Sequence, residues 1–245
     1  MKTLAFTLRN TKEIIRDPLT VIFGLGFPVA VLLMLSLIQA NIPVDLFRIE
    51  MLSPGIAVFG LSFISLFAGM LISKDRYSAF IMRLYISPMK ACDFIIGYIL
   101  PLLPIALIQM MVCYAVSLFL GLNITVNILI ALAASIPAAV LFIAIGLLAG
   151  SLFSDKQVGG LCGALLTNLC AWLSGIWFDI KLLGSGFESF AKILPFYHAV
   201  EAGRLAVIGK YSEIPNHILI VSVYAFIILA ISVWVFTKRT KNDNI

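Results

Sequence analysis

The chain has 245 residues, of which 62% are hydrophobic and only 12% are charged, and its formal net charge is +5 at pH 7. A soluble domain is about half apolar and a quarter charged, so this composition excludes an ordinary soluble domain and indicates a polytopic membrane protein. The excess of Lys and Arg is then a signal of topology rather than of nucleic-acid binding.

Residues 1–18 predict an amphipathic helix. One side of the helical wheel carries mainly apolar residues, namely Met1, Leu4, Leu8, Thr11, Ile14 and Ile15. The other side is charged, with Lys2, Arg9, Lys12, Glu13, Arg16 and Asp17. Such a helix lies in the membrane interface, and Pro18 ends it because proline cannot continue a helix.

Six apolar runs follow along the chain. A transmembrane helix needs about 20 predominantly apolar residues. The runs that meet this length cover residues 19–40, 52–73, 94–120, 129–153, 158–178 and 218–236, and none carries an acidic or basic residue in its middle. We therefore predict an all-α polytopic membrane protein with six transmembrane helices in a single domain, residues 1–245.

The distribution of Lys and Arg orients these spans. If the N-terminus is inside, 12 of the 17 Lys and Arg residues fall in inner segments. Because positive charge is retained on the cytoplasmic side, both termini are expected in the cytoplasm of a cell whose plasma membrane the chain crosses several times.

The segment 74–93, between the second and third runs, is the most charged interior stretch. Tyr77, Phe80, Ile81 and Leu84 follow helical spacing and share one face, while Arg76 and Arg83 point away from it. The pattern predicts a short cytoplasmic helix. Either this helix only sets topology, or its apolar face binds a groove on a cytoplasmic partner.

The outer segment 179–217 predicts two short helices separated by Pro195. In the second of these, His198, Glu201 and Arg204 fall on one side at i, i+3 and i+6. Ionisable groups at membrane depth are tolerated only where they face protein or water. Either Glu201 and Arg204 form a structural ion pair, or the three side chains contact the transported substrate.

Catalytic chemistry is missing from the sequence. It contains no phosphate-binding loop, no H-E-x-x-H and no G-x-S-x-G motif, and its two histidines and four dispersed cysteines indicate no metal site or disulfide. We therefore expect neither enzyme activity nor a bound cofactor. The spans also lack the buried charges that ion-driven carriers use, so energy for transport must come from elsewhere.

Two polar amide residues and two pairs of glycines within the spans can each be interpreted in two ways. Gln109 and Asn168 are either interhelical hydrogen-bonding groups or parts of a translocation route. The G-x-x-x-G pairs at Gly146–Gly150 and 159–163 either pack helices within the chain or form a dimer seam.

Several short motifs in order resemble those of a known family. They are Arg16-Asp17-Pro18, Ser53-Pro54-Gly55, Asp75-Arg76 followed by Arg83-Leu84 and Pro88, and Leu194-Pro195 with Tyr197 and Arg204. Over essentially the whole chain this arrangement is similar to the permeases of type-2 ATP-binding-cassette (ABC) exporters. One departure is that Ala79-Phe80-Ile81-Met82 stands where family members often have Gly-Thr-Leu-Glu, which makes this segment more apolar.

The resemblance implies a half-transporter in which two permease chains, identical or different, work with two cassette ATPase subunits. ATP and Mg²⁺ would bind in those partner subunits. The N-terminal helix and the helix of segment 74–93 would contact the ATPase. The expected docking residues are Arg76, Tyr77, Phe80, Ile81, Arg83 and Leu84. The outer segment 179–217 would form a re-entrant hairpin before the last span.

The resemblance also implies a route between two permeases, lined by spans one, two and five. Thr167 and Asn168 in span five are its candidate lining residues, while His198, Glu201 and Arg204 are the candidate outer gate. The expected cargo is a lipophilic or amphipathic drug, antibiotic or peptide that is moved out of the cell. Export of a glycan-linked lipid or wall polymer is the alternative. An ATP-independent channel or secondary carrier, and a scaffold that moves nothing, are alternatives of other classes.

Overall fold

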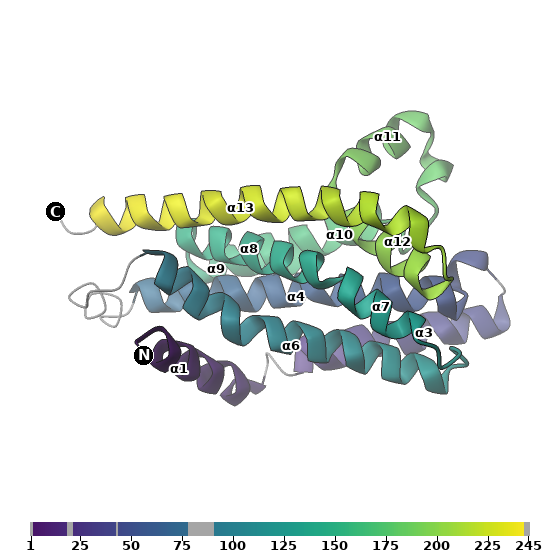
Figure 1. Ribbon diagram of the computed structural model, residues 1–245, viewed down its shortest axis with the longest axis horizontal. Helices are drawn as coiled ribbons and strands as arrows, with labels where there is room; N and C mark the ends of the chain where they lie inside the picture. Colours follow the sequence, from purple (N-terminus) through teal and green to yellow (C-terminus); the bar gives the residue numbers. More distant parts are fainter. Residues whose placement is uncertain (1, 19–21, 43, 78–90, 243–245) are drawn as a thin grey trace.

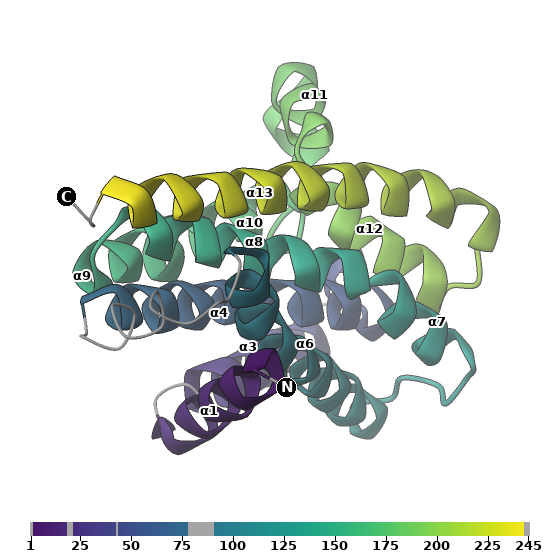
Figure 2. The ribbon, with the colours of Figure 1, turned by 60° about the vertical axis from the view of Figure 1, so that its left-hand side comes forward.

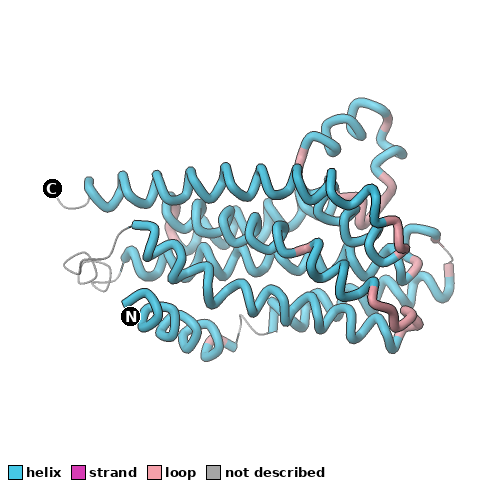
Figure 3. The backbone as a smooth tube through the Cα atoms, viewed as in Figure 1, coloured by secondary structure: helices cyan, strands magenta, loops and turns pink. Residues whose placement is uncertain are grey.

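Helices form nearly all of the computed structural model, which describes residues 2–18, 22–42, 44–77 and 91–242. Figure 3 shows the loops as short stretches between helices, with no strand among the described residues. The predicted all-α class is therefore confirmed. Both chain termini lie at the same end of the helix bundle (Figure 1).

Five helical stretches in the described part of the chain are long and apolar enough to cross a membrane. They cover Ile22–Asn41, Ile49–Arg76, Asp93–Phe119, Asn127–Leu152 and Tyr211–Lys238. The corresponding elements are η1 (Ile22–Gly26) with α3 (Phe27–Asn41), α4 (Ile49–Tyr77), α6 (Ala91–Phe119), α7 (Asn127–Ala134) with α8 (Ile136–Leu152), and η5 (Tyr211–Glu213) with α13 (Ile214–Asn242). A short turn, η2 (Asp45–Phe47), joins α3 to α4.

The run predicted over 158–178 forms three shorter pieces instead of one regular helix. These are α9 (Asp155–Val158), a π-helical stretch η3 (Gly159–Leu166) and α10 (Thr167–Leu173). A sixth span of the predicted length is therefore not confirmed. Three glycines in η3 weaken regular α-helical winding, and the Thr167 hydroxyl donates to the Cys162 carbonyl five residues back, at 3.0 Å, in keeping with the wider π turn.

Helix α4 is the centre of the bundle. In its most apolar stretch 89% of the residues are buried, against 22% in the corresponding stretch of the last span, so α13 is largely exposed. Helix α8 packs closely on α4: a Cβ on Gly146 would lie 2.1 Å from the Ser65 carbonyl oxygen, and one on Gly150 would lie 2.2 Å from that of Gly69. This pair of glycines thus packs helices within the chain.

The outer segment contains the two predicted helices. After η4 (Ile180–Leu183), α11 (Ser185–Ile193) ends at the extended residue Leu194, and α12 (Pro195–Val207) begins at Pro195. Helix α12 packs against α13, α7 and α4, whereas α11 stands away from the bundle (Figure 2). The re-entrant placement of this pair in the membrane stays a prediction.

Candidate functional site

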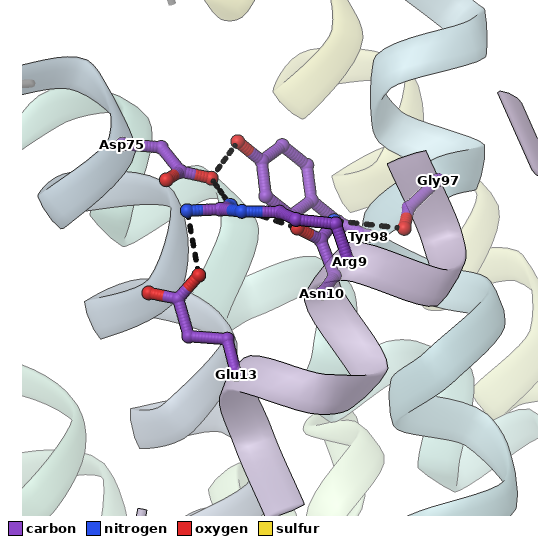
Figure 4. A network of polar contacts seen from close by, with 6 residues as sticks. All are labelled: Arg9, Asn10, Glu13, Asp75, Gly97 and Tyr98. Carbon is purple, nitrogen blue, oxygen red and sulfur yellow. Dashed lines mark hydrogen bonds and ion pairs between the residues drawn. The ribbon is translucent and has the colours of Figure 1, made fainter. Parts of the chain in front are cut away.

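A polar network fastens α1 (Lys2–Arg16) to the bundle at the end that carries both termini. The Arg9 Nη1 atom lies 2.6 Å from Asp75 Oδ2, and the Tyr98 hydroxyl donates to the same oxygen at 2.8 Å. A second guanidinium nitrogen of Arg9 lies 2.6 Å from Glu13 Oε2. Figure 4 shows how Arg9 lies between the two carboxylates, so that α1, α4 and α6 meet at one ionic contact.

The same helix is seated on α6 by close packing. Phe6 makes edge contacts with the rings of Phe94 and Tyr98, with ring centroids 5.8 and 5.0 Å apart. Gly97 allows this approach, because a Cβ there would lie 2.4 Å from the Phe6 ring. The fully buried Asn10 donates to the Gly97 carbonyl at 3.1 Å and accepts from Arg9 at 2.9 Å.

This seating refines the predicted amphipathic helix. The predicted apolar side grouped Leu4, Leu8 and Ile15 with Ile14, but only Ile14 of these four is buried. The other three are more than half exposed and form an apolar face turned away from the bundle. The helix therefore has a face buried against the bundle, an exposed charged face and an exposed apolar face, and its position in the membrane interface stays a prediction.

Burial and charge act together on the network. Partial burial lowers the pKa of Arg9, but the hydrogen bond and charge of Asp75, together with Glu13 and Tyr98, more than offset this effect, so the pKa is raised. Partial burial raises the pKa of Glu13, and the nearby Asp75 adds to this while Arg9 opposes it. Asp75 has only 2% of its side chain exposed, so its charge needs compensation, and the Arg9 guanidinium supplies one positive charge beside it.

The network lies where the predicted docking segment leaves the bundle. Arg76, the first predicted docking residue, donates to the Gly150 carbonyl at 2.8 Å, which fixes the end of α4 against α8. Tyr77 is the last residue of α4. The other predicted docking residues are Phe80, Ile81, Arg83 and Leu84, and they lie outside the described residues.

A cavity of about 1230 Å³ opens beside the network, between α1, η1, α4 and η3. Its wall is apolar and aromatic, with Phe23 of η1 and Phe63, Phe67 and Met70 of α4. Besides Arg9, its lining includes the exposed cations Lys12, Arg16 and Lys74 and the acids Glu13 and Asp17. Elements of the first, second and fifth predicted runs therefore surround one space.

The two candidate route residues lie close to this cavity but do not line it. Thr167 is buried and its hydroxyl is engaged by the Cys162 carbonyl. Asn168 is exposed, and its amide donates to the Ala164 carbonyl at 2.8 Å. Both side chains return to their own helix in this arrangement. Gln109 is buried against Gly60 of α4 and donates to Cys113 at 3.3 Å, consistent with a packing role.

At the other end of the bundle, Arg204 of α12 joins three elements. Its Nε donates to the Met51 carbonyl at 3.1 Å and its Nη2 to the Gly175 carbonyl at 2.8 Å. Gly175 has a φ of +69°, a conformation that glycine adopts readily. Glu201 lies 3.7 Å from Arg204, so the sequence spacing correctly brought these two side chains together.

The third candidate gate residue, His198, has different partners. Its Nε2 lies 2.8 Å from the Lys192 carbonyl, and its Nδ1 lies 2.9 Å from Nδ1 of His217. A carbonyl only accepts, so in neutral His198 Nε2 carries the proton and Nδ1 accepts from His217. The pair links α12 to the start of α13.

The arrangement defines a class: a polytopic α-helical membrane protein with an amphipathic N-terminal helix clamped to its spans and, in the described part of the chain, no cluster of three metal-ligating residues. Comparison with known families gives the narrower identification. Residues 1–208 match the family model described as ABC-2 type transporter, so the chain belongs to this family and is the membrane component of an ABC transporter. Family membership implies association with an ATPase subunit. A comparison with curated proteins found no significant match.

Proposed function

We propose that the chain is the permease subunit of an ATP-driven exporter, which works as a dimer of permeases with separate ATPase subunits. The carrying observation is the Arg9–Asp75–Tyr98 contact, which joins α1, α4 and α6 at the start of segment 74–93. A displacement of that segment or of α1 is thereby transmitted directly to the two spans α4 and α6. The family match supports an external source of energy.

The proposed cargo is a lipophilic or amphipathic compound, such as a drug, antibiotic or peptide. Its support is the aromatic wall of the cavity between α1, η1, α4 and η3, because sites for small lipophilic ligands are lined mainly by apolar and aromatic side chains. The same cavity also suits the lipid part of a glycan-linked cargo. Transport of labelled compounds of both kinds into inverted vesicles distinguishes the two.

The docking proposal is tested by purifying the tagged chain from native membranes in mild detergent. We expect a near-stoichiometric ATPase in the preparation, and its loss on Leu84→Asp. Leu182→Asp, on an exposed outer turn, is the matched control and should retain the ATPase. Retention by both variants would refute the docking assignment. Failure of the parent chain to retain any ATPase, with flux unaffected by ATP, would favour a channel or carrier.

The proposed outer gate is tested at Glu201. The two backbone carbonyls hold Arg204 independently of Glu201, so Glu201→Gln should leave the fold intact. If the gate proposal holds, this variant changes the transport rate while the amount of protein in the membrane stays constant. Loss of the protein from the membrane would instead assign Glu201 a structural role.

A further inference from the structure

The cavity beside α1 combines two features that suit one kind of molecule. One side is a wall of apolar and aromatic side chains, including Phe23, Phe63 and Phe67. The lining also includes three exposed cations, Lys12 and Arg16 of α1 and Lys74 of α4, none of which forms an ion pair with any residue the structure describes. Apolar chains and an anionic group therefore both find complementary surfaces.

The acids in the lining, Glu13 and Asp17, cancel only part of this charge. Glu13 is engaged by Arg9 at 2.6 Å, and Arg9 is itself held by the buried Asp75. Arg9, Glu13 and Asp75 together carry a formal charge of −1 and Asp17 a further −1, so the three cations leave this group of residues with a net charge of +1, which attracts an anion. They come from two different elements, α1 and α4.

The position of the cavity identifies the source of such a molecule. Helix α1 turns Leu4, Leu8 and Ile15 outward as an exposed apolar face, which is the property of a helix lying among lipid headgroups. Leu8 also lines the cavity, so the space is continuous with that face. Basic residues at this depth attract anionic lipids, to which each cation contributes about fivefold in affinity.

We propose that this cavity binds one anionic phospholipid from the adjacent leaflet, with its phosphate between Lys12, Arg16 and Lys74 and an acyl chain along the phenylalanine wall. This binding site for membrane lipid is argued from the cavity and its charges and not from the exporter proposal; a cargo that enters the same cavity competes with the lipid. It leaves Arg9 in its contact with Asp75. The volume of about 1230 Å³ is in keeping with a ligand larger than a drug-sized molecule.

The test uses the purified full chain in detergent, mixed with equal amounts of phosphatidylglycerol and phosphatidylcholine that have the same acyl chains. Native mass spectrometry counts the lipids retained per chain. We expect one phosphatidylglycerol to be retained in preference. Replacing Lys12, Arg16 and Lys74 together with Gln should lower its affinity about a hundredfold, from about fivefold for each cation. The control replaces the exposed Lys156, Lys181 and Lys210 together with Gln, and should retain the lipid.

A second variant keeps all cations and fills the cavity. A Cβ on Gly159 meets no atom within 4 Å, so Gly159→Leu enters the open space beside η3 without a clash at its Cβ. It should lower lipid retention even if the triple variant fails to fold. Equal retention of the two lipids by the parent chain would overturn the proposal. Displacement of the lipid by glycerol phosphate at equal concentration would also overturn it, because that result would show an anion site that needs no acyl chain.

Discussion

Replacement of Arg9 by Met gives the sharpest test of the clamp on α1. Met retains much of the apolar stem but removes the cation 2.6 Å from Asp75, which is 2% exposed and also accepts from the Tyr98 hydroxyl. Breaking a fully buried ion pair costs about 3–5 kcal/mol, and breaking an exposed one costs about 0–1 kcal/mol. Because the Arg9 side chain is 34% exposed, we expect an intermediate loss of about 2–3 kcal/mol in the free energy of unfolding.

The assay is denaturant-induced unfolding of the purified chain in mixed micelles. Arg48→Met is the matched control, because Arg48 lies 3.9 Å from Glu50 with 62% of its side chain exposed, and its loss should cost at most about 1 kcal/mol. In an Asp75→Asn background the Arg9→Met cost should shrink, because the buried charge is already gone. Equal costs for Arg9→Met and Arg48→Met, or strict additivity with Asp75→Asn, would refute the clamp.

Two further predictions concern glycines at close contacts. Gly146→Leu should strongly destabilise the bundle, because its Cβ would lie 2.1 Å from the Ser65 carbonyl, whereas Gly160→Leu, with open space around its Cβ, should unfold like the parent in the same titration. Gly97→Ala should displace Phe6 and release α1 from the bundle, which limited proteolysis detects as faster cleavage within α1. Adding Phe6→Leu to this variant should partly restore protection. An unchanged cleavage rate in Gly97→Ala would contradict the packing of α1 on α6.

Much of the architecture could be predicted because apolar runs and proline positions are local signals. The spans of α4, α6 and α13 and the break before Pro195 are of this kind. The run 158–178 differs because its glycines and the Thr167 hydroxyl favour π-helical winding, which overall hydropathy does not report. Hydropathy alone measures whether a segment prefers lipid, and not how its backbone is wound.

The polar clamp could not be predicted because its partners are far apart in the sequence. Arg9 and Asp75 are separated by 66 positions, and Asp75 was noted only as part of a motif beside Arg76. The available signal was an acid at the end of an apolar run, which requires a cation or donors when it is buried. By contrast, Glu201 and Arg204 are three positions apart on one helix, so spacing alone brought them together.

The clamp and the cavity are linked, because Lys12 and Arg16 are on α1 and Lys74 is on α4. Asn10 seats α1 on α6 through a neutral hydrogen bond and does not line the cavity. Asn10→Ala therefore removes no charge from the site but loosens the helix that places two of its three cations.

We expect Asn10→Ala to lower the free energy of unfolding by about 1 kcal/mol and phosphatidylglycerol affinity about threefold to fivefold. Thr11→Ala is the control, because the Thr11 hydroxyl donates only to the Thr7 carbonyl of its own helix, and it should change neither quantity much. If Asn10→Ala lost stability yet retained the lipid as tightly as Thr11→Ala, the cations would act as a diffuse surface charge. The cavity would then not require a seated α1, and the lipid would be held by the wall of α4 and η3 alone.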